Sequence, residues 1–270
     1  MLGWHQYLTT GQEAELERIR LESTVWEPAG RRLLELIGDG RGRRALDVGC
    51  GSLGWLRLLS DWTGESGAVL GADADRRRLE HAAGLVEEES LVNVRLIVDD
   101  PFASELEPRG FDLVHARLAL ASLGRAEEQL AGLLGLVAPG GVLVLEEPDT
   151  CSWRFNAPTP APAAERLIGL VREAAAATGG DLDAGRQLPA LFRRLGLTPH
   201  LRTEVLALEP GHPYLRSPLQ LAETLRPRLL ASVDEEALDA LIAAATGELA
   251  DPERWGTSFT MVQCWARVCR

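Results

Sequence analysis

The chain has 270 residues, of which 46% are hydrophobic and 25% charged, so it is long enough for one large domain or one domain with a lid. Its net charge of −12 argues against nucleic acid and anionic membranes as partners, because both bind basic patches. No apolar run approaches the roughly 20 residues that span a bilayer, and the first residues do not have the form of a signal peptide. The four cysteines show no metal-like spacing, so the sequence predicts a cytoplasmic protein without a metal ion.

Helical spacing of apolar residues predicts helices over the first 40 residues. Leu16, Ile19 and Val25 mark one apolar face. Pro28 is expected to start a second helix, because proline suits the first helical turn.

From Arg44 onwards the pattern is an alternation of strands and helices. Short apolar segments predict strands at 45–48, 68–72, 94–98, 111–116 and 142–147. Helices are predicted between them near 54–62, 76–90 and 126–137. Apolar strands joined by helical crossovers are typical of a parallel sheet that is covered on both faces.

The alternation ends after Pro148. Residues 150–162 have loop character. Helices are then predicted at 163–178, 187–195, 218–231 and 234–250, with strands at 198–208 and 258–268. Because a long excursion joins these last two strands, we expect an antiparallel pair at the sheet edge. The predicted fold is α/β, a doubly wound, seven-stranded, mostly parallel sheet with a helical cap over the C-terminal strand ends.

The glycine-rich turn at residues 45–54, with the sequence ALDVGCGSLG, is the most informative segment. An apolar strand passes through Gly49, Gly51 and Gly54 into a helix, and this spacing is typical of dinucleotide sites. Glycines there let backbone N–H groups and a helix N-terminus approach a ligand. Asp47 favours a different ligand, because a carboxylate in an apolar strand needs N–H groups or an ammonium group nearby.

Acidic residues follow the next two predicted strands. Asp73 ends the second strand, and Asp99 and Asp100 end the third. In open α/β sheets, ligands bind beyond the carboxyl ends of the strands, and a carboxylate about 20 residues after the glycines can hold ribose hydroxyls. Each of these residues alone is more often a helix cap or a surface charge, but their joint placement predicts one ligand site.

Several segments together resemble the motifs of class I S-adenosylmethionine-dependent methyltransferases. They are Leu46–Gly51, Asp73 with Asp100, Phe111–Arg117 and Ala138–Leu145. The chain looks like the small-molecule branch of bacterial quinone and natural-product pathways, and Tyr7 with segments 17–20, 179–189 and 262–267 resembles that branch as well. The resemblance implies S-adenosyl-L-methionine as cofactor, S-adenosyl-L-homocysteine as product and a small-molecule substrate.

The resemblance also implies roles for individual residues. Gly49 and Gly51 would approach the methionine part, Asp73 would hold the ribose, and Asp100 would accept from the adenine amino group. Arg18 would pair with the cofactor carboxylate, with an exposed helix charge as an equal alternative. The full set of residues implied to bind the cofactor is Tyr7, Arg18, Asp47, Gly49, Cys50, Gly51, Asp73, Ala74, Asp99, Asp100, Pro101, Ala116, Arg117 and Leu118. The chain departs from the family at Ser52-Leu53-Gly54, where a third glycine usually stands one or two residues earlier.

Three units are implied by the resemblance. Residues 1–40 would close over the cofactor, and residues 41–149 would form the Rossmann-like core that binds it. Residues 150–270 would complete the core and supply a substrate cap from 150–185 and 209–257.

Catalytic groups are less clearly marked. Methyl transfer from a sulfonium is an in-line displacement, in which the protein mainly positions the reactants and excludes water. A hydroxyl acceptor also needs a base. His115, Glu147 and Asp149 are the candidates, although His115 is more often expected in the core and Asp149 equally as a helix cap. Trp153 and Phe155 are candidates for the walls of an apolar substrate pocket, with packing of the cap as the alternative.

The predicted function is methyl transfer to a small, fairly apolar natural product. One alternative is a non-methylating, pericyclase-like cyclase on the same scaffold, in which the bound sulfonium acts as a fixed charge. A regulatory subunit that binds the cofactor without turnover is a second alternative. A nicotinamide dehydrogenase is a third, against which Asp47 argues. The assembly is left open, with a homodimer as one form.

Overall fold

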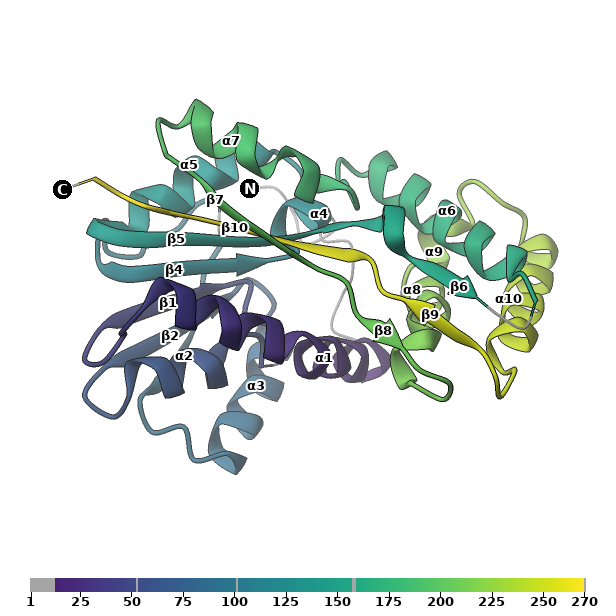
Figure 1. Cartoon of the computed structure of the whole chain (residues 1–270), viewed down its shortest axis with the longest axis horizontal. Coiled ribbons are helices and arrows are strands. Elements are labelled where there is room, and N and C mark those ends of the chain that lie inside the picture. Colours follow the sequence, from purple (N-terminus) through teal and green to yellow (C-terminus); the bar gives the residue numbers. More distant parts are fainter. Residues whose placement is uncertain (1–12, 52, 101, 157–158, 270) are drawn as a thin grey trace.

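The computed structural model describes residues 13–51, 53–100, 102–156 and 159–269 (Figure 1). Its main sheet has seven strands in the order β3-β2-β1-β4-β5-β10-β7. They are β1 (Arg44–Val48), β2 (Ala68–Asp73), β3 (Val94–Val98), β4 (Phe111–Arg117), β5 (Val137–Asp149), β7 (His200–Glu204) and β10 (Thr260–Arg267). The strands β1 to β5 pair in parallel, and β10 is antiparallel to both β5 and β7. The predicted seven-stranded sheet with an antiparallel edge is therefore confirmed.

Helices cover both faces of this sheet, as predicted (Figure 1). One face packs against α1 (Glu13–Ile37), α2 (Leu56–Thr63) and α3 (Arg76–Glu88). The other face packs against α5 (Ala126–Leu136) and α7 (Leu188–Arg194), and the short α4 (Ala119–Leu123) follows β4. Alternate residues of the buried strands contribute to the two apolar layers, since successive strand side chains point to opposite faces.

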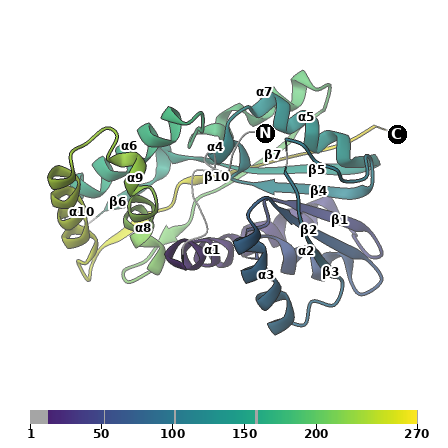
Figure 2. The same ribbon diagram turned by 180° about the vertical axis from the view of Figure 1, so that it is seen from behind.

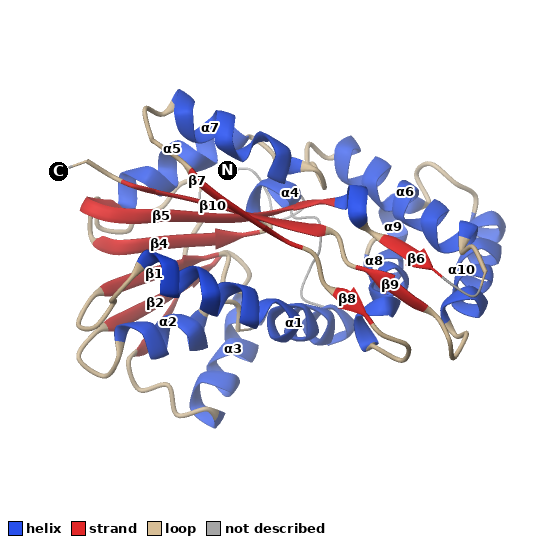
Figure 3. Cartoon of the chain, in the orientation of Figure 1, coloured by secondary structure: helices blue, strands red, loops and turns tan. Residues whose placement is uncertain are grey.

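A second, three-stranded sheet extends the first and was not predicted. It contains β6 (Arg154–Asn156), β9 (Trp255–Thr257) and β8 (Ala207–Leu208), paired antiparallel in that order. These strands continue β5, β10 and β7 in turn, after a short break in each chain segment (Figure 3). The prediction of a single strand at 198–208 is wrong in this respect, because β7 and β8 divide it, whereas the strand predicted at 258–268 is confirmed as β10.

Hydroxyl side chains stabilise the backbone at these breaks. The Ser258 backbone N–H donates to the Leu206 carbonyl at 3.0 Å, and the Ser258 hydroxyl accepts from the Leu206 N–H at 2.9 Å. The Ser152 hydroxyl donates to the Ser258 carbonyl at 3.0 Å. Where the strand-to-strand hydrogen bonds are interrupted, the serine hydroxyls thus bind backbone groups that would otherwise lack a partner.

The cap lies at one end of the main sheet and has its own apolar core (Figure 2). Its helices are α6 (Pro162–Ala177), α8 (Ser217–Thr224), α9 (Arg226–Leu229) and α10 (Glu235–Leu249). The helix predicted at 218–231 is divided at Leu225 into α8 and α9. Among the described helices, α6 packs against each of the other three.

Helix α1 connects the cap with the sheet. The prediction that Pro28 starts a second helix is wrong, because one helix runs from Glu13 to Ile37 with Pro28 inside it. Trp26 packs in the cap core, and Leu33 packs against the sheet. Burial on both sides of the exposed Pro28 offsets the helical hydrogen bond that proline cannot donate. No helix in the described part of the chain is long and apolar enough to cross a membrane.

Candidate active site

The glycine turn leaves β1 with backbone dihedrals that favour glycine. Gly49 has a φ of +70° and Gly51 a φ of +59°, and a Cβ at Gly49 would meet nothing within 4 Å. A Cβ at Gly54 would lie 2.7 Å from the Asp47 Oδ2 atom. The first glycine therefore leaves open space for a ligand, while Gly54 lets the turn close onto a carboxylate.

Two carboxylates hold this turn in place. The Trp55 backbone N–H donates to Asp47 Oδ2 at 2.9 Å. Asp73, at the end of β2, accepts from the Gly51 N–H at 3.0 Å and from the Asp75 N–H at 2.8 Å. Asp47 thus has the N–H partner that its place in an apolar strand required.

Arg78, in the first turn of α3, faces the carboxylate of Asp73 and was not predicted. Its Nη1 atom lies 4.0 Å from Asp73 Oδ2, and its Nη2 atom donates to Glu15 at 2.7 Å. Burial raises the pKa of Asp73, and the charge of Arg78 opposes this shift in part. The sequence did contain a signal for Arg78, because this residue lies five positions after Asp73, at the start of a helix that follows a strand end.

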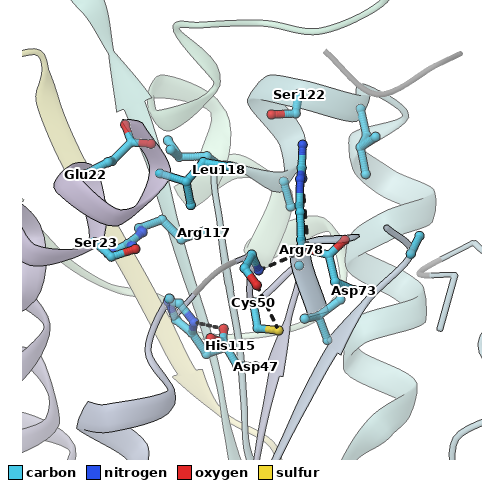
Figure 4. A pocket seen from close by; sticks show the side chains of 18 of the residues that line it. Glu22, Ser23, Asp47, Cys50, Asp73, Arg78, His115, Arg117, Leu118 and Ser122 are labelled. Carbon is cyan, nitrogen blue, oxygen red and sulfur yellow. Dashed lines mark hydrogen bonds and ion pairs between the residues drawn. The ribbon is translucent and has the colours of Figure 1, made fainter. Parts of the chain in front are cut away.

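A first cavity lies over the turn and contains about 950 Å³ of space free of protein atoms, open solvent included (Figure 4). The predicted residues that line it are Arg18, Asp47, Gly49, Cys50, Gly51, Asp73, Ala74, His115, Arg117 and Leu118. Further polar residues that line it without having been predicted are Glu22, Ser23, Arg78, Ser122 and Gln129. Ala116 is buried in the sheet, and Tyr7 and Pro101 lie outside the described residues.

The two acidic residues after β3 have different positions. Asp99 lines a hollow that adjoins the first cavity and shares Val48 and Leu133 with it. Asp100 is exposed and accepts a hydrogen bond from the Phe102 N–H at 2.9 Å. The structure therefore brings Asp99, but not Asp100, next to the cavity.

His115 lies beneath the turn between two carboxylates. Its Nδ1 atom is 2.7 Å from Asp47 Oδ1, and its Nε2 atom is 3.3 Å from Glu146 Oε2. The ring stacks on Trp55, whose indole N–H also donates to Glu146. Burial lowers the pKa of His115, but the charges and hydrogen bonds of the two carboxylates outweigh burial and raise it. Because both ring nitrogens are engaged, the geometry assigns this side chain to holding Asp47.

The other two candidates for the base do not line the cavity. Glu147 accepts backbone N–H bonds from Leu120 at 2.8 Å and Ala121 at 2.9 Å, so it holds the start of α4. Burial raises the pKa of Glu147 to about 8. Asp149 is paired with Arg186 at 2.6 Å, and hydrogen bonds from that guanidinium hold the pKa of Asp149 well below its usual range.

A second cavity adjoins the first, with about 540 Å³ of space free of protein atoms, open solvent included. The two cavities share Arg18, Glu22, Leu118 and Ser122. The remaining lining residues of the second cavity are Ala121, Pro148, Thr150, Trp153, Leu182, Ser217, Leu221 and Phe259. Trp153 therefore lies at a cavity wall, whereas Phe155 packs in the cap core.

Glu22 lies at the junction of the two cavities. It accepts from the Tyr214 hydroxyl at 3.0 Å and from Arg18 Nη1 at 3.1 Å. Both residues are 7% exposed, and Arg18 Nε has no hydrogen-bond partner among the described residues. Glu22 was missed in the sequence, because its spacing of four residues from Arg18 is that of an ordinary helix salt bridge.

Comparison with known proteins identifies relatives of this chain. A family model described as a methyltransferase domain matches residues 39–185. Aklanonic acid methyltransferase DauC of Streptomyces sp. (strain C5) is 31% identical over 129 residues, which cover 48% of this chain and 59% of that protein. Demethylmenaquinone methyltransferase of Staphylococcus aureus (strain MRSA252) is 31% identical over 123 residues, which cover 46% and 49%. The chain spans about half the length of these curated relatives.

Solved structures share the fold at low sequence identity. The YcgJ protein of Bacillus subtilis has a TM-score of 0.59 at 15% identity, over 88% of this chain and 97% of that chain. Geranyl diphosphate C-methyltransferase of Streptomyces coelicolor A3(2) has a TM-score of 0.51 at 13% identity, over 90% and 79%. The family match over residues 39–185 covers more than half of the chain. The chain therefore belongs to the methyltransferase-domain family and has its class I, Rossmann-like fold.

Proposed function

We propose that the first cavity binds S-adenosyl-L-methionine and that the protein transfers its methyl group to a small, largely apolar molecule. The observation that carries this proposal is the cavity at the carboxyl ends of β1, β2 and β4, with open glycine backbone on one side and Asp73 on another. Membership of the methyltransferase-domain family supports it. The sulfonium of the cofactor supplies an electrophilic methyl group.

The residues of the cavity fit the parts of this cofactor. The open backbone at Gly49 suits the methionine part, and Asp73 has acceptor capacity left for ribose hydroxyls, since an ionised carboxylate has about four acceptor positions. The unpartnered Arg18 Nε suits the carboxylate. The adjoining hollow suits the adenine, which favours Asp99 over the exposed Asp100 as its acceptor. Leu118 would lie near the sulfonium, at the junction with the second cavity.

We base the proposed methyl acceptor on the substrates in the names of the two relatives, aklanonic acid and demethylmenaquinone. A quinone-type natural product is consistent with the apolar second cavity and with Trp153 in its wall. The division into residues 1–40, 41–149 and 150–270, a homodimer and a cytoplasmic location stay predictions.

Calorimetric titration tests the cofactor. We expect S-adenosyl-L-homocysteine to bind and NAD not to bind. Asp73→Asn should weaken S-adenosyl-L-homocysteine binding by about 10- to 100-fold, because a hydrogen bond to a charged group contributes roughly 1.5–3 kcal/mol. Asp61→Asn, at an exposed position in α2, is the matched control and should bind normally. Binding of NAD in place of S-adenosyl-L-homocysteine would contradict the proposal.

Methyl-labelled S-adenosyl-L-methionine tests the reaction. Incubation with hydroxyanthraquinones and reduced naphthoquinones should yield products that carry the label. Conversion of an acceptor without label transfer would instead support the non-methylating alternative.

A further inference from the structure

The second cavity is electrically neutral and largely apolar. Its only charged lining residues in the described chain are Arg18 and Glu22, which pair with each other at 3.1 Å. Leu182, Leu221 and Phe259 supply apolar surface. This pair leaves the cavity without net charge, and a charged ligand would lose its hydration there, so the cavity suits a neutral molecule.

One residue of this cavity wall carries a polar group that lacks a partner. Trp153 is 2% exposed, and its indole N–H has no hydrogen-bond partner among the described residues. A buried tryptophan N–H normally has a partner, because an unsatisfied buried donor costs free energy. A ligand carbonyl in the cavity would supply the missing acceptor.

The junction between the cavities holds a carboxylate and a strained backbone. Figure 4 shows Glu22 near Leu118 in the upper part of the view, with His115 and Asp47 in the lower part. Leu118 has a φ of +56°, which is uncommon for leucine, and it lines both cavities. Glu22 is the only carboxylate that lines both cavities in the described part of the chain.

We propose that the second cavity binds the methyl acceptor as a neutral, largely apolar phenol or enol whose carbonyl accepts from Trp153, and that Glu22 takes the hydroxyl proton. This rests on the proposed function of the first cavity. The acceptor oxygen forms a bond to the methyl carbon while the carbon–sulfur bond breaks and its electron pair stays on sulfur. The proton passes to a Glu22 oxygen and then to solvent, so charge balances. Tyr214 and Arg18 are positioning residues, because they orient the carboxylate through hydrogen bonds.

A matched pair of ligands tests the cavity. The probes are 6-hydroxy-1-tetralone and 5,6,7,8-tetrahydro-2-naphthol, which differ only in the ketone, titrated into protein saturated with S-adenosyl-L-homocysteine. Trp153→Phe should weaken binding of the ketone about 5-fold and leave the ketone-free probe unchanged, because one neutral hydrogen bond is lost. Leu221→Trp, which fills the cavity, should abolish binding of both probes. Trp255→Phe, at an exposed tryptophan, is the control and should change neither.

A pH profile tests Glu22. With 6-hydroxy-1-tetralone as acceptor, Glu22→Gln should lower kcat by about 10²- to 10⁴-fold at pH 7, the range for loss of a general base. The remaining rate should rise with pH as the phenol ionises, because the ionised phenol no longer needs a base; the carbonyl para to the hydroxyl brings this ionisation below the ordinary phenol value of about 10. Glu17→Gln, at an exposed position on the same helix, should keep the wild-type rate and profile. A purely structural role of Glu22 would lower the rate without this change in pH dependence.

The two proposals fail in different ways. Failure of S-adenosyl-L-homocysteine to bind overturns the proposed function. If it binds but Leu221→Trp leaves the binding of the tetralone unchanged, or neither probe binds, the acceptor site is overturned. If the tetralone binds but is not methylated, or Glu22→Gln keeps the wild-type pH profile, the assignment of Glu22 is overturned.

Discussion

At the scale of single residues, buried charges under the glycine turn set its stability. His115 is 1% exposed and contacts two carboxylates, Asp47 and Glu146, which are almost fully buried. Gln263 and Trp55 donate further hydrogen bonds to Glu146, at 2.6 and 2.7 Å. Removal of one partner from such a group leaves an uncompensated buried charge, which is costly.

The variant His115→Phe tests this arrangement. Phenylalanine can keep the stack on Trp55 but has no N–H groups, so the free energy of unfolding should fall by about 3–5 kcal/mol. A raised folded-state pKa gives stability that is complete below the ordinary value of 6.5 and is lost as pH rises through the folded-state pKa. The difference between wild type and variant should therefore shrink above pH 6.5 in urea unfolding. His200→Phe, at an exposed stacked histidine, should show neither effect.

Glu147 gives a second pH dependence of stability. Its folded-state pKa of about 8 lies above the ordinary value of 4.5, so the folded state binds more protons between these values. Stability should fall as pH rises from about 5 to 8, and the advantage of wild type over Glu147→Gln should fall with it. Guanidinium unfolding at several pH values measures this. A constant difference across the range, or the same slope in Glu65→Gln at an exposed loop, would contradict the pKa shift.

The turn residues could be predicted from the sequence because their roles depend on nearby positions. Asp47, Gly49 and Asp73 follow from strand ends and glycine spacing. Glu22 could not be predicted, since its hydrogen bond to Tyr214 joins residues 192 positions apart. The unpartnered N–H of Trp153 likewise depends on tertiary packing that no local pattern records.

At the scale of elements, Ser90 at the end of α3 has a backbone conformation that usually belongs to glycine. Ser90 has a φ of +55°, the left-handed conformation in which glycine is favoured after a helix. The Leu91 N–H donates to the Val86 carbonyl at 3.0 Å, and the Ser90 N–H donates to the Glu87 carbonyl at 3.0 Å. These two bonds form the Schellman motif that usually carries glycine.

Glycine at this position should therefore stabilise the protein. Ser90→Gly should raise the free energy of unfolding by about 0.5–1 kcal/mol, because relief of left-handed strain exceeds the added entropy of the unfolded chain. Thermal unfolding should shift upward by roughly 1–4 °C. Ser232→Gly, at an exposed position with no positive φ, should instead lower the unfolding temperature.

The main sheet could be predicted because each parallel strand is a short apolar run between helices. The second sheet could not, since β8 has two residues and β9 has three, too few for a period to show. Pro28 misled the prediction for another reason. Proline usually starts a helix, but tertiary packing on both sides keeps α1 continuous through it.

At the scale of the whole molecule, two apolar cores meet along α1. Trp26 is fully buried in the cap core, where it stacks on Phe259 at 5.2 Å and donates to the Tyr214 hydroxyl at 3.2 Å. One end of the same helix packs on the sheet through Leu33. Cap and core should therefore unfold together as long as this helix joins them.

Truncation of Trp26 should allow the cap and the core to unfold separately. Trp26→Ala should lower the free energy of unfolding by about 3–5 kcal/mol, as expected for a buried tryptophan. Urea transitions followed by a probe in the cap and a probe in the sheet should no longer coincide. Trp255→Ala, 42% exposed, should change stability by about 0.5 kcal/mol or less and keep the transitions coincident.

The breaks between the two sheets lie beside the second cavity. Three tethers, at residues 150–153, 205–206 and 258–259, cross from one sheet to the other. Each tether is only two to four residues long, so the end of the main sheet and the start of the second sheet stay close together. Trp153 and Phe259 belong to two of these tethers and also line the second cavity, so the geometry of the breaks sets the width of that cavity directly.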